Sequence, residues 1–496
     1  MDLGPRATET HDAELPRSRG ILPDMQDTSR ARFVLFVASL AIFLAGLTGS
    51  SLNIALPSIG REFGVGAVAI GWATTAYLLA VAVGLLPLGR LADLRGRSRA
   101  FTAGAVVFTA ASLLCALAPS YRFLVGARAL QGLGGAILVS TSTALVCSAF
   151  PPEERGRALG WNTAAVYLGM SVGPFLGGIL TTRLGWRSVF VTTVPLGLLV
   201  AVLSAWRIRD ESREPRGARF DVVGTVIYGA GIAGLMIGLA GLPARQSVAL
   251  LLLGAATLIA FGIRELRHRS PLLDLRLFRT NPTLTLSNLA AFANYAATAA
   301  VGFLLSLYLQ YNRGLTAEQA GLLLIAQPVV QALFSPLAGR MSDHVAPRIV
   351  ASAGMAMTTL GLASFALLGP RTPIPVLVST LAWLGLSFAL FSAPNTNAVM
   401  GCVDRRSYGM ASASLATMRA LGQMTSMAVA MLLLSLYVGS SSINGGNATR
   451  FLGSARASFV VFAGMCFLGV FASLARGTGG IPPACPSSTS PDDARS

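Results

Sequence analysis

Residues 33–57 read FVLFVASLAIFLAGLTGSSLNIALP, a long run with no charged side chain. A bilayer core about 30 Å thick is crossed by a helix of roughly 20 apolar residues, so this run can span a membrane. It is too long for the core of a signal peptide, and it lacks a convincing cleavage site. The run therefore predicts a first membrane-spanning helix that the protein retains.

Similar apolar runs recur along the rest of the chain. We predict fourteen spans, near residues 33–57, 70–88, 101–118, 122–149, 158–181, 188–206, 222–241, 247–264, 283–308, 320–338, 349–369, 374–399, 409–438 and 457–475. Their length indicates helices, because barrel strands show only about ten residues of alternating hydrophobicity. The chain is thus predicted to be an all-α integral membrane protein, with disordered tails at residues 1–32 and 476–496.

The composition agrees with a membrane domain and argues against nucleic-acid binding. Of the 496 residues, 53% are hydrophobic and only 12% are charged, whereas soluble domains carry about 25% charged residues. The formal net charge of +17 at first suggests a nucleic-acid partner. However, the basic residues lie in short loops between apolar runs rather than on one soluble face. We therefore expect membrane lipids, and no nucleic acid, among the partners.

The arginines are distributed unequally between the loops. The loops after the even-numbered spans hold several each, such as Arg90, Arg95, Arg97 and Arg99, whereas the opposite loops hold mostly single arginines. Arginine-rich loops face the cytoplasm. Because the number of spans is even, we expect both termini in the cytoplasm and a multi-pass protein of the inner cell membrane.

The two halves of the chain resemble each other. GRLAD at residues 89–93 recurs as GRMSD at 339–343, on the same side of the membrane and after a corresponding span. This indicates duplication into two six-helix bundles, residues 33–206 and 282–475, with two additional spans central in the sequence at 207–281. Duplicated bundles that rock about a midplane site are the usual architecture of secondary transporters.

The loop at residues 89–99, GRLADLRGRSR, carries one acid among four bases. It is predicted to be a tight turn bounded by glycines such as Gly89. Asp93 can pair with an arginine such as Arg97, or lie at a helix N-terminus where the dipole favours an anion. Because Asp343 repeats the acid, we expect a latch that holds one access state closed. A plain positive-inside loop would have a similar composition.

Arg128 lies inside the predicted fourth span, in RALQGLGG at residues 128–135. An arginine at the centre of a span costs about 2.5–3.5 kcal/mol on insertion scales, so we expect it to have a function. It should face the bundle interior near Gln131. The alternative is an arginine that snorkels to water, because Arg128 is only a few residues from the outer end of the span.

The fifth span carries small residues that favour close helix packing. They are Gly169, Gly173, Gly177 and Gly178. Glycines four apart let helices approach closely, and Pro174 removes a backbone hydrogen bond and bends the helix. Such glycines are common in membranes, but together with the proline they predict an interface that seals or hinges a pathway.

These three stretches resemble the loop-two, fourth-span arginine and fifth-span antiporter motifs of the major facilitator superfamily. The fourteen spans are similar to its drug:proton antiporter branch, the EmrB/QacA group. Further matches are NIALP at residues 53–57 and Arg419 with Gly422 and Gln423. The resemblance covers residues 33–475.

The resemblance implies export of small amphipathic molecules, such as drugs, antibiotics or secondary metabolites, driven by the proton gradient without a bound cofactor. Gating is expected of Gly89, Asp93, Arg97 and Asp343. Coupling or a place in the substrate cavity is expected of Arg128, Gln131, Asn53 and Arg419. The helix with Gly173 and Pro174 is expected to favour export.

The first span departs from the family pattern. Members often carry an aspartate where this chain has Thr48, and no Asp or Glu lies well inside any predicted span. Asp221 and Glu265 occur only at span ends. An intramembrane carboxylate is the usual proton carrier and the usual partner of a cationic drug. With arginines and no countering acid, the cavity is expected to prefer neutral or anionic amphiphiles.

Other polar residues lie within the predicted spans. They are Asn162, Tyr167, Asn288, Asn294, Tyr295, Gln327, Gln331, Asn395 and Asn397. Each more often bonds a neighbouring helix than a substrate, but a subset is expected to line a cavity.

Other functions fit the sequence less well. Uptake or uniport of a specific solute is the main alternative, and the Gly173–Pro174 motif argues against it. A membrane enzyme would need a nucleophile, a metal cluster or an acid pair, and the histidines His11, His268 and His344 lie in tails or loops. No GxxxxGK[ST] loop is present, so ATP drive is not expected. Neither a metal nor an obligate protein partner is expected.

Overall fold

The computed structural model describes residues 25–208, 220–242, 244–268, 275–403, 408–439 and 447–476. Among them, 14 helical segments are long and apolar enough to cross a membrane. This confirms the predicted all-α membrane fold with fourteen spans. Most of each predicted tail lies outside the described residues, but residues 25–32 belong to the first helix rather than to a disordered tail.

The first half of the chain forms a bundle of six spans. Its helices are α1 (Met25–Phe63), α2 (Ala67–Arg95), α3 (Arg97–Ala116), α4 (Tyr121–Ala149), α5 (Pro152–Leu184), α6 (Arg187–Val191) and α7 (Thr193–Arg207). Helices α6 and α7 together make the sixth span. Helix α1 packs on α5, α4 packs on α2 and α3, and α3 packs on α7.

The second half forms a bundle with the same order of contacts. Its elements are α11 (Pro282–Thr298), α12 (Val301–Leu307), the π-helical turn η1 (Tyr308–Asn312), α13 (Ala317–Leu324), α14 (Ala326–His344), α15 (Pro347–Ala366), α16 (Ile374–Gly401), α17 (Tyr408–Tyr437) and α18 (Ala448–Leu474). Helix α11 packs on α17, α16 packs on α14 and α15, and α15 packs on α18. The repeated contacts agree with the duplication that the sequence indicates.

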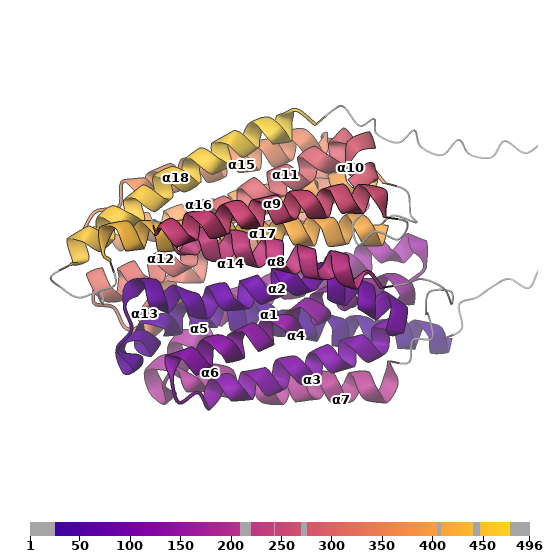
Figure 1. The fold of residues 1–496 in the computed structure, drawn as a ribbon, viewed down its shortest axis with the longest axis horizontal. Helices are drawn as coiled ribbons and strands as arrows, with labels where there is room; N and C mark the ends of the chain where they lie inside the picture. The colour runs from indigo at the N-terminus through magenta and orange to yellow at the C-terminus, as the bar shows by residue number, and fades with distance from the viewer. Residues whose placement is uncertain are drawn as a thin grey trace, which may run out of the picture.

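The two bundles lie side by side with their helices along one common direction (Figure 1), the first in indigo and purple and the second in orange and yellow. Helix α1 begins and α18 ends at the same end of the molecule, where α2 meets α3. Because Arg90, Arg95, Arg97 and Arg99 belong to that junction, we name it the arginine-rich end. The opposite end is the arginine-poor end.

The two additional spans are α8 (Val222–Ala240) and α9 (Arg245–Arg267), followed by the short α10 (Leu275–Thr280). They pack on each other, and α8 also contacts α2 and α17, one helix from each bundle. The Tyr228 hydroxyl donates to the Ala82 carbonyl at 2.8 Å. Only 11% of the apolar window of α9 is buried. Although central in the sequence, these helices therefore lie at the periphery of the fold.

Asp221, which the sequence places at a span end, joins the two ends of the α8–α9 hairpin. It accepts hydrogen bonds from the Gly224 N–H at 2.8 Å and from Arg264 at 2.9 Å. Burial alone raises the pKa of Asp221, but these hydrogen bonds hold it below its usual value. Asp221 is therefore an ionised structural anchor outside the spans.

The prediction that the first span ends at Pro57 is wrong, because α1 continues to Phe63. A proline inside a helix removes the N–H that would bond the carbonyl four residues earlier, here that of Asn53. The hydroxyl of Ser306 on α12 donates to this carbonyl at 2.7 Å instead. A group from the other bundle thus compensates for the proline, and the helix continues.

Other boundaries also differ from the prediction. Helix α18 begins at Ala448 rather than at residue 457, and Arg456 in its early turns is accommodated by donating to the Leu368 carbonyl at 2.6 Å. The sixth and tenth spans are each divided into two helices, and the ninth is divided into α11, α12 and the π-helical turn η1. Such breaks are hard to predict from amino-acid composition, because the residues on both sides are equally apolar.

Candidate functional site

The stretch from Gly89 to Arg95 is helical and forms the last turns of α2, so the predicted tight turn is wrong in its extent. The chain reverses only at Gly96, whose φ of 107° suits glycine. Gly89 serves helix packing instead. A Cβ at Gly89 would lie 3.2 Å from the Cβ of Ser140 on α4.

Asp93 and Arg97 form an ion pair across this reversal. Nε of Arg97 donates to Oδ1 of Asp93 at 2.7 Å, and the side chains are 32% and 31% exposed. The pair links α2 to α3 within the first bundle. The backbone of the repeated acid, Asp343, lies in α14, but its side chain is outside the described part of the structure.

Arg128 is fully buried between the helices of the first bundle. Its Nε donates to the Ala73 carbonyl of α2 at 3.0 Å, and its Nη1 donates to the amide oxygen of Gln131. Gln131 in turn donates to Ser112 of α3 at 2.6 Å, and the Tyr77 ring centre lies 4.4 Å from the guanidinium carbon. Arg128 therefore connects three helices and does not snorkel to water.

The glycines of α5 form its contact with α1. A Cβ at Gly169 would press on the Phe43 carbonyl, one at Gly173 on the Ser50 hydroxyl, and one at Gly177 would lie 2.8 Å from Cα of Ser51. Ser51 also donates its hydroxyl to the Gly173 carbonyl at 2.8 Å. Close approach of the two backbones is thus possible only without side chains at these positions.

The same motif also faces the second bundle. A Cβ at Gly178 would lie 2.6 Å from the Ala317 carbonyl at the start of α13. A Cβ at Gly321 of α13 would press on the Pro174 carbonyl. The predicted antiporter motif therefore packs on its own bundle through three glycines and on the other bundle through Gly178 and Pro174.

Hydrogen bonds join the two bundles toward the arginine-poor end. Gln310 donates to the Ile54 carbonyl at 3.0 Å, and the Glu318 N–H donates to the Thr182 hydroxyl at 3.2 Å. Arg183 and Glu318 form an exposed ion pair at 3.6 Å. Asn53 contributes its backbone carbonyl to the contact between the bundles, because Ser306 donates a hydrogen bond to it. The sequence had suggested a role for the Asn53 side chain instead.

A polar cluster connects the bundles near the middle of α5. The hydroxyls of Tyr167 and Ser392 on α16 share a hydrogen bond of 2.6 Å. Arg419 of α17 donates to the Thr396 hydroxyl at 2.8 Å, and its guanidinium carbon lies 5.6 Å from the ring centre of Tyr295 on α11. Tyr167 also interacts with Tyr295 and Arg419. These five residues are the interface cluster.

The interface cluster carries a positive charge whose described partners are hydroxyls and an aromatic ring. Nε of Arg419 has no hydrogen-bond partner in the described structure. The sequence indicates a functional role for Tyr167, Tyr295 and Arg419, but it does not single out Ser392 or Thr396. Hydroxyl residues in helices commonly bond their own helix, as Thr396 does to the Ser392 carbonyl at 2.8 Å. The cluster can bind an anionic or a polar neutral group.

Some of the other polar residues that the sequence singled out bond within one bundle. Asn162 donates to Ser142 at 3.1 Å, and Asn397 donates to Ser342 at 2.7 Å. The side chain of Asn395 is fully buried, and both its polar atoms lack hydrogen-bond partners in the described structure. Of the residues predicted for a cavity, the structure brings Tyr167, Tyr295 and Arg419 together in the interface cluster.

Thr48, at the position where the family often has aspartate, is buried and bonds its own helix. Its hydroxyl donates to the Leu44 carbonyl at 2.7 Å, which satisfies the donor locally. Within the described ranges, no group of three or more His, Cys, Asp or Glu side chains is placed to hold a metal ion.

Comparison with known proteins identifies the family. The model of the Major Facilitator Superfamily matches residues 38–286 and 287–491. The chain is 30% identical to the riboflavin transporter RibZ of Clostridioides difficile, over 88% of this chain and 95% of the relative. It is 34% identical to the multidrug resistance protein Stp of Mycobacterium tuberculosis, over 80% and 74% of the two chains.

The fold is also similar to a solved structure. A bacterial homologue of the human lysosomal transporter Spinster, in an inward-facing and unoccupied conformation, has a TM-score of 0.63 at 15% identity, over 90% of this chain and 96% of the other. The relatives and the fold are those of transporters. The chain belongs to the major facilitator superfamily, and its fourteen spans fit the drug-exporter group of that superfamily.

Proposed function

We propose that the protein exports small amphipathic organic molecules across the cell membrane by alternating access, with the proton gradient as the energy source. The observation that carries this proposal is the interface cluster. It brings Tyr167 of the first bundle together with Tyr295, Ser392 and Arg419 of the second. A substrate bound between two such bundles meets groups from both, so movement of the bundles changes its access. Similarity to the multidrug resistance protein Stp supports export.

The orientation follows from the positive-inside rule, which assigns the arginine-rich end to the cytoplasm together with both termini. The contacts through Gln310, Glu318 and Gly178 then hold the outer ends of the bundles together. In this proposal, these contacts close the outer side of the interface while a molecule for export is taken up from the cytoplasm. Reporter fusions in successive arginine-rich loops should all report the cytoplasmic side.

The substrate class follows from the charge of the interface cluster. A guanidinium without a carboxylate partner favours an anionic or neutral substrate over a cation. Arg419→Gln should therefore reduce transport of an anionic amphiphile by about 10- to 100-fold, the range for losing a charged hydrogen bond. Transport of a neutral analogue should change little. Equal losses for both substrates, or a wild type that favours a lipophilic dication over a matched anion, would contradict this assignment.

Export and its energy source are tested with a panel of substrates in everted membrane vesicles. Accumulation should require a pH gradient and should collapse when an uncoupler is added. Accumulation that is indifferent to the gradient would replace the antiporter by a uniporter.

The ion pair at the arginine-rich end offers a separate test of gating. Because Asp93 and Arg97 are partly exposed, their pair stabilises the fold by only about 0–1 kcal/mol. Asp93→Asn should therefore leave the melting temperature nearly unchanged while it lowers the transport rate. A large loss of thermal stability with a normal rate per folded molecule would assign the pair a structural role instead.

Uptake or uniport of a specific solute is a second candidate function. It is favoured by the similarity to the riboflavin transporter RibZ over nearly the whole of both chains. The two functions differ in the direction of net flux. A single solute that accumulates in right-side-out vesicles, and not in everted ones, would favour uptake.

A further inference from the structure

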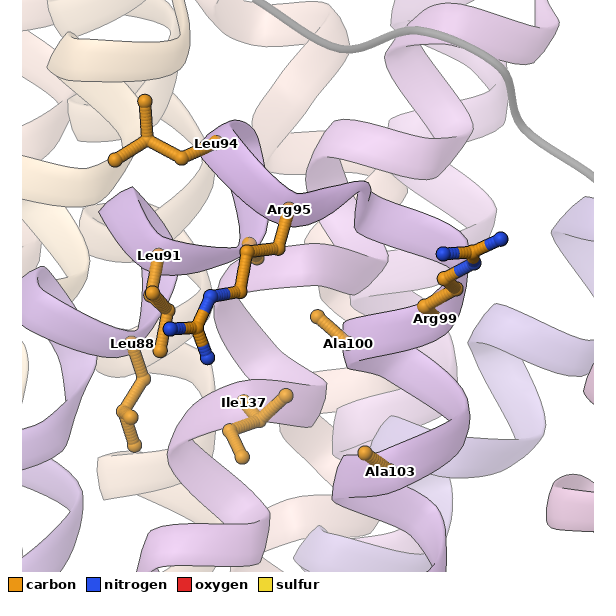
Figure 2. A pocket seen from close by; sticks show the side chains of 9 residues that line it. Leu88, Leu91, Leu94, Arg95, Arg99, Ala100, Ala103 and Ile137 are labelled. Carbon is orange, nitrogen blue, oxygen red and sulfur yellow. The ribbon is translucent and has the colours of Figure 1, made fainter. Parts of the chain in front are cut away.

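A groove of about 550 Å³ lies between α2, α3 and α4 at the arginine-rich end. It is distinct from the interface cluster. Its apolar wall is formed by Leu88, Leu91, Ala92, Leu94, Ala100, Ala103 and Ile137, and its two charged residues are Arg95 and Arg99. Figure 2 shows the Arg95 side chain extending from the end of α2 toward Leu88 and Leu91, whereas the guanidinium of Arg99 on α3 points away from Arg95. The groove thus combines a hydrocarbon surface with two positive charges.

Among the residues that the structure describes, neither arginine is paired with an acid. No carboxylate is among the residues that line the groove, and the nearby Asp93 is bound by Arg97 at 2.7 Å. Both Arg95 and Arg99 are exposed, and neither has an ion pair within the described ranges. Each of these two guanidinium groups is able to bind a phosphate bidentately.

The position of the groove favours a membrane lipid over a soluble anion. Leu88 lies seven residues before Arg95 in α2, which is roughly 10 Å deeper along the helix. Ala103 continues into Val106, Ala110 and Leu113, an exposed stripe along one face of α3. The charges therefore lie at the level of headgroups, and the apolar wall extends toward the lipid-facing surface, where an acyl chain can lie.

The second bundle lacks these charges. At the offset of 250 residues that relates GRLAD to GRMSD, Arg95 corresponds to Val345 and Arg99 to Ile349. The second junction also differs in its backbone, since two residues, Val345 and Ala346, separate α14 from α15, where Gly96 alone separates α2 from α3. The two arginines are thus a property of this groove and not of the repeated motif.

We infer that the groove binds an anionic phospholipid, with the headgroup at the rim that carries Arg95 and Arg99 and an acyl chain along Leu88, Leu91 and Ile137. The inference does not depend on the direction of transport or on its substrate. The proposed orientation only adds that the lipid belongs to the cytoplasmic leaflet. Because the groove adjoins the Asp93–Arg97 ion pair, a bound lipid would stabilise the α2–α3 junction.

The test is lipid binding to the purified full-length protein in detergent, measured by native mass spectrometry. Phosphatidylglycerol and phosphatidylcholine with identical acyl chains are the two probes. The wild type should bind phosphatidylglycerol more tightly. Arg95→Ala and Arg99→Ala should each weaken that binding about fivefold, and the double variant about 30-fold, as expected for basic residues near an anionic membrane surface.

Arg340→Ala is the matched control, because Arg340 is an exposed arginine of the repeated motif at the same end of the molecule. It should bind phosphatidylglycerol like the wild type. Since Arg95 and Arg99 are exposed, their loss should leave the melting temperature in lipid-free detergent unchanged. Equal binding of the two lipids, wild-type binding by the double variant, or full competition by inorganic phosphate would overturn the inference.

Discussion

Replacing Arg128 with alanine is expected to reduce gradient-driven efflux by about 5- to 150-fold, the range of a typical coupling free energy. The guanidinium is buried and joins α2, α3 and α4 through Ala73, Gln131 and Ser112. A guanidinium stays protonated in proteins, so it cannot carry the proton itself. Instead, Arg128 can hold α2, α3 and α4 in the arrangement that changes when another group binds the proton. Rates of efflux with and without the gradient measure the effect.

Arg122→Ala is the matched control for this experiment. Arg122 is an exposed arginine in the first turn of the same helix, and its loss should leave coupled efflux unchanged. Membrane abundance of both variants is measured by immunoblot. If Arg128→Ala retains full gradient-driven efflux at normal abundance, Arg128 has no part in coupling.

Gly173→Val is expected to abolish transport or assembly of the first bundle. A Cβ at Gly173 would collide with the Ser50 hydroxyl and lie 2.9 Å from the Leu47 carbonyl. Backbone atoms of α1 cannot give way locally, so α1 and α5 must separate. Overpacking of this kind costs typically 1–3 kcal/mol. Thermal unfolding in detergent and efflux per folded molecule together measure the result.

Gly160→Val in the same helix separates the effect of close packing from that of helix propensity. No heavy atom lies within 4 Å of a Cβ at Gly160. A glycine-to-valine change in an exposed helix position is close to neutral or slightly favourable. Gly160→Val should therefore keep both stability and transport. If the two variants behave alike, the contact between α1 and α5 is not what Gly173 provides.

The sequence was sufficient to predict the spans and the repeat, because a bilayer imposes a minimum apolar length that is visible along the chain. Their boundaries were harder to predict. Pro57 predicts the end of a helix, whereas Ser306, far along the chain, satisfies the Asn53 carbonyl that the proline leaves free. A long-range partner of this kind leaves no local signal.

Only part of the candidate site could be predicted, because some of its residues are brought together by long-range contacts. Arg128 stood out because an intramembrane charge is costly, and the structure places it beside Gln131 as expected. Ser392 and Thr396 did not stand out, because hydroxyl residues are ordinary in membrane helices. Only the fold brings them to Tyr167 and Arg419. Chemically common residues acquire a role through position, which a single sequence does not show.

The most direct test of the account is a distance measured across the arginine-poor end during transport. Spin labels on Leu184→Cys and Leu322→Cys, both exposed in the wild type, report the separation of α5 and α13 by double electron–electron resonance. The background lacks the native cysteines, and the protein is reconstituted in liposomes. Two bundles that open alternately should give two distances, and the population of the longer one should increase with substrate and acidic pH. A single distance that never changes while the protein transports substrate would contradict alternating access.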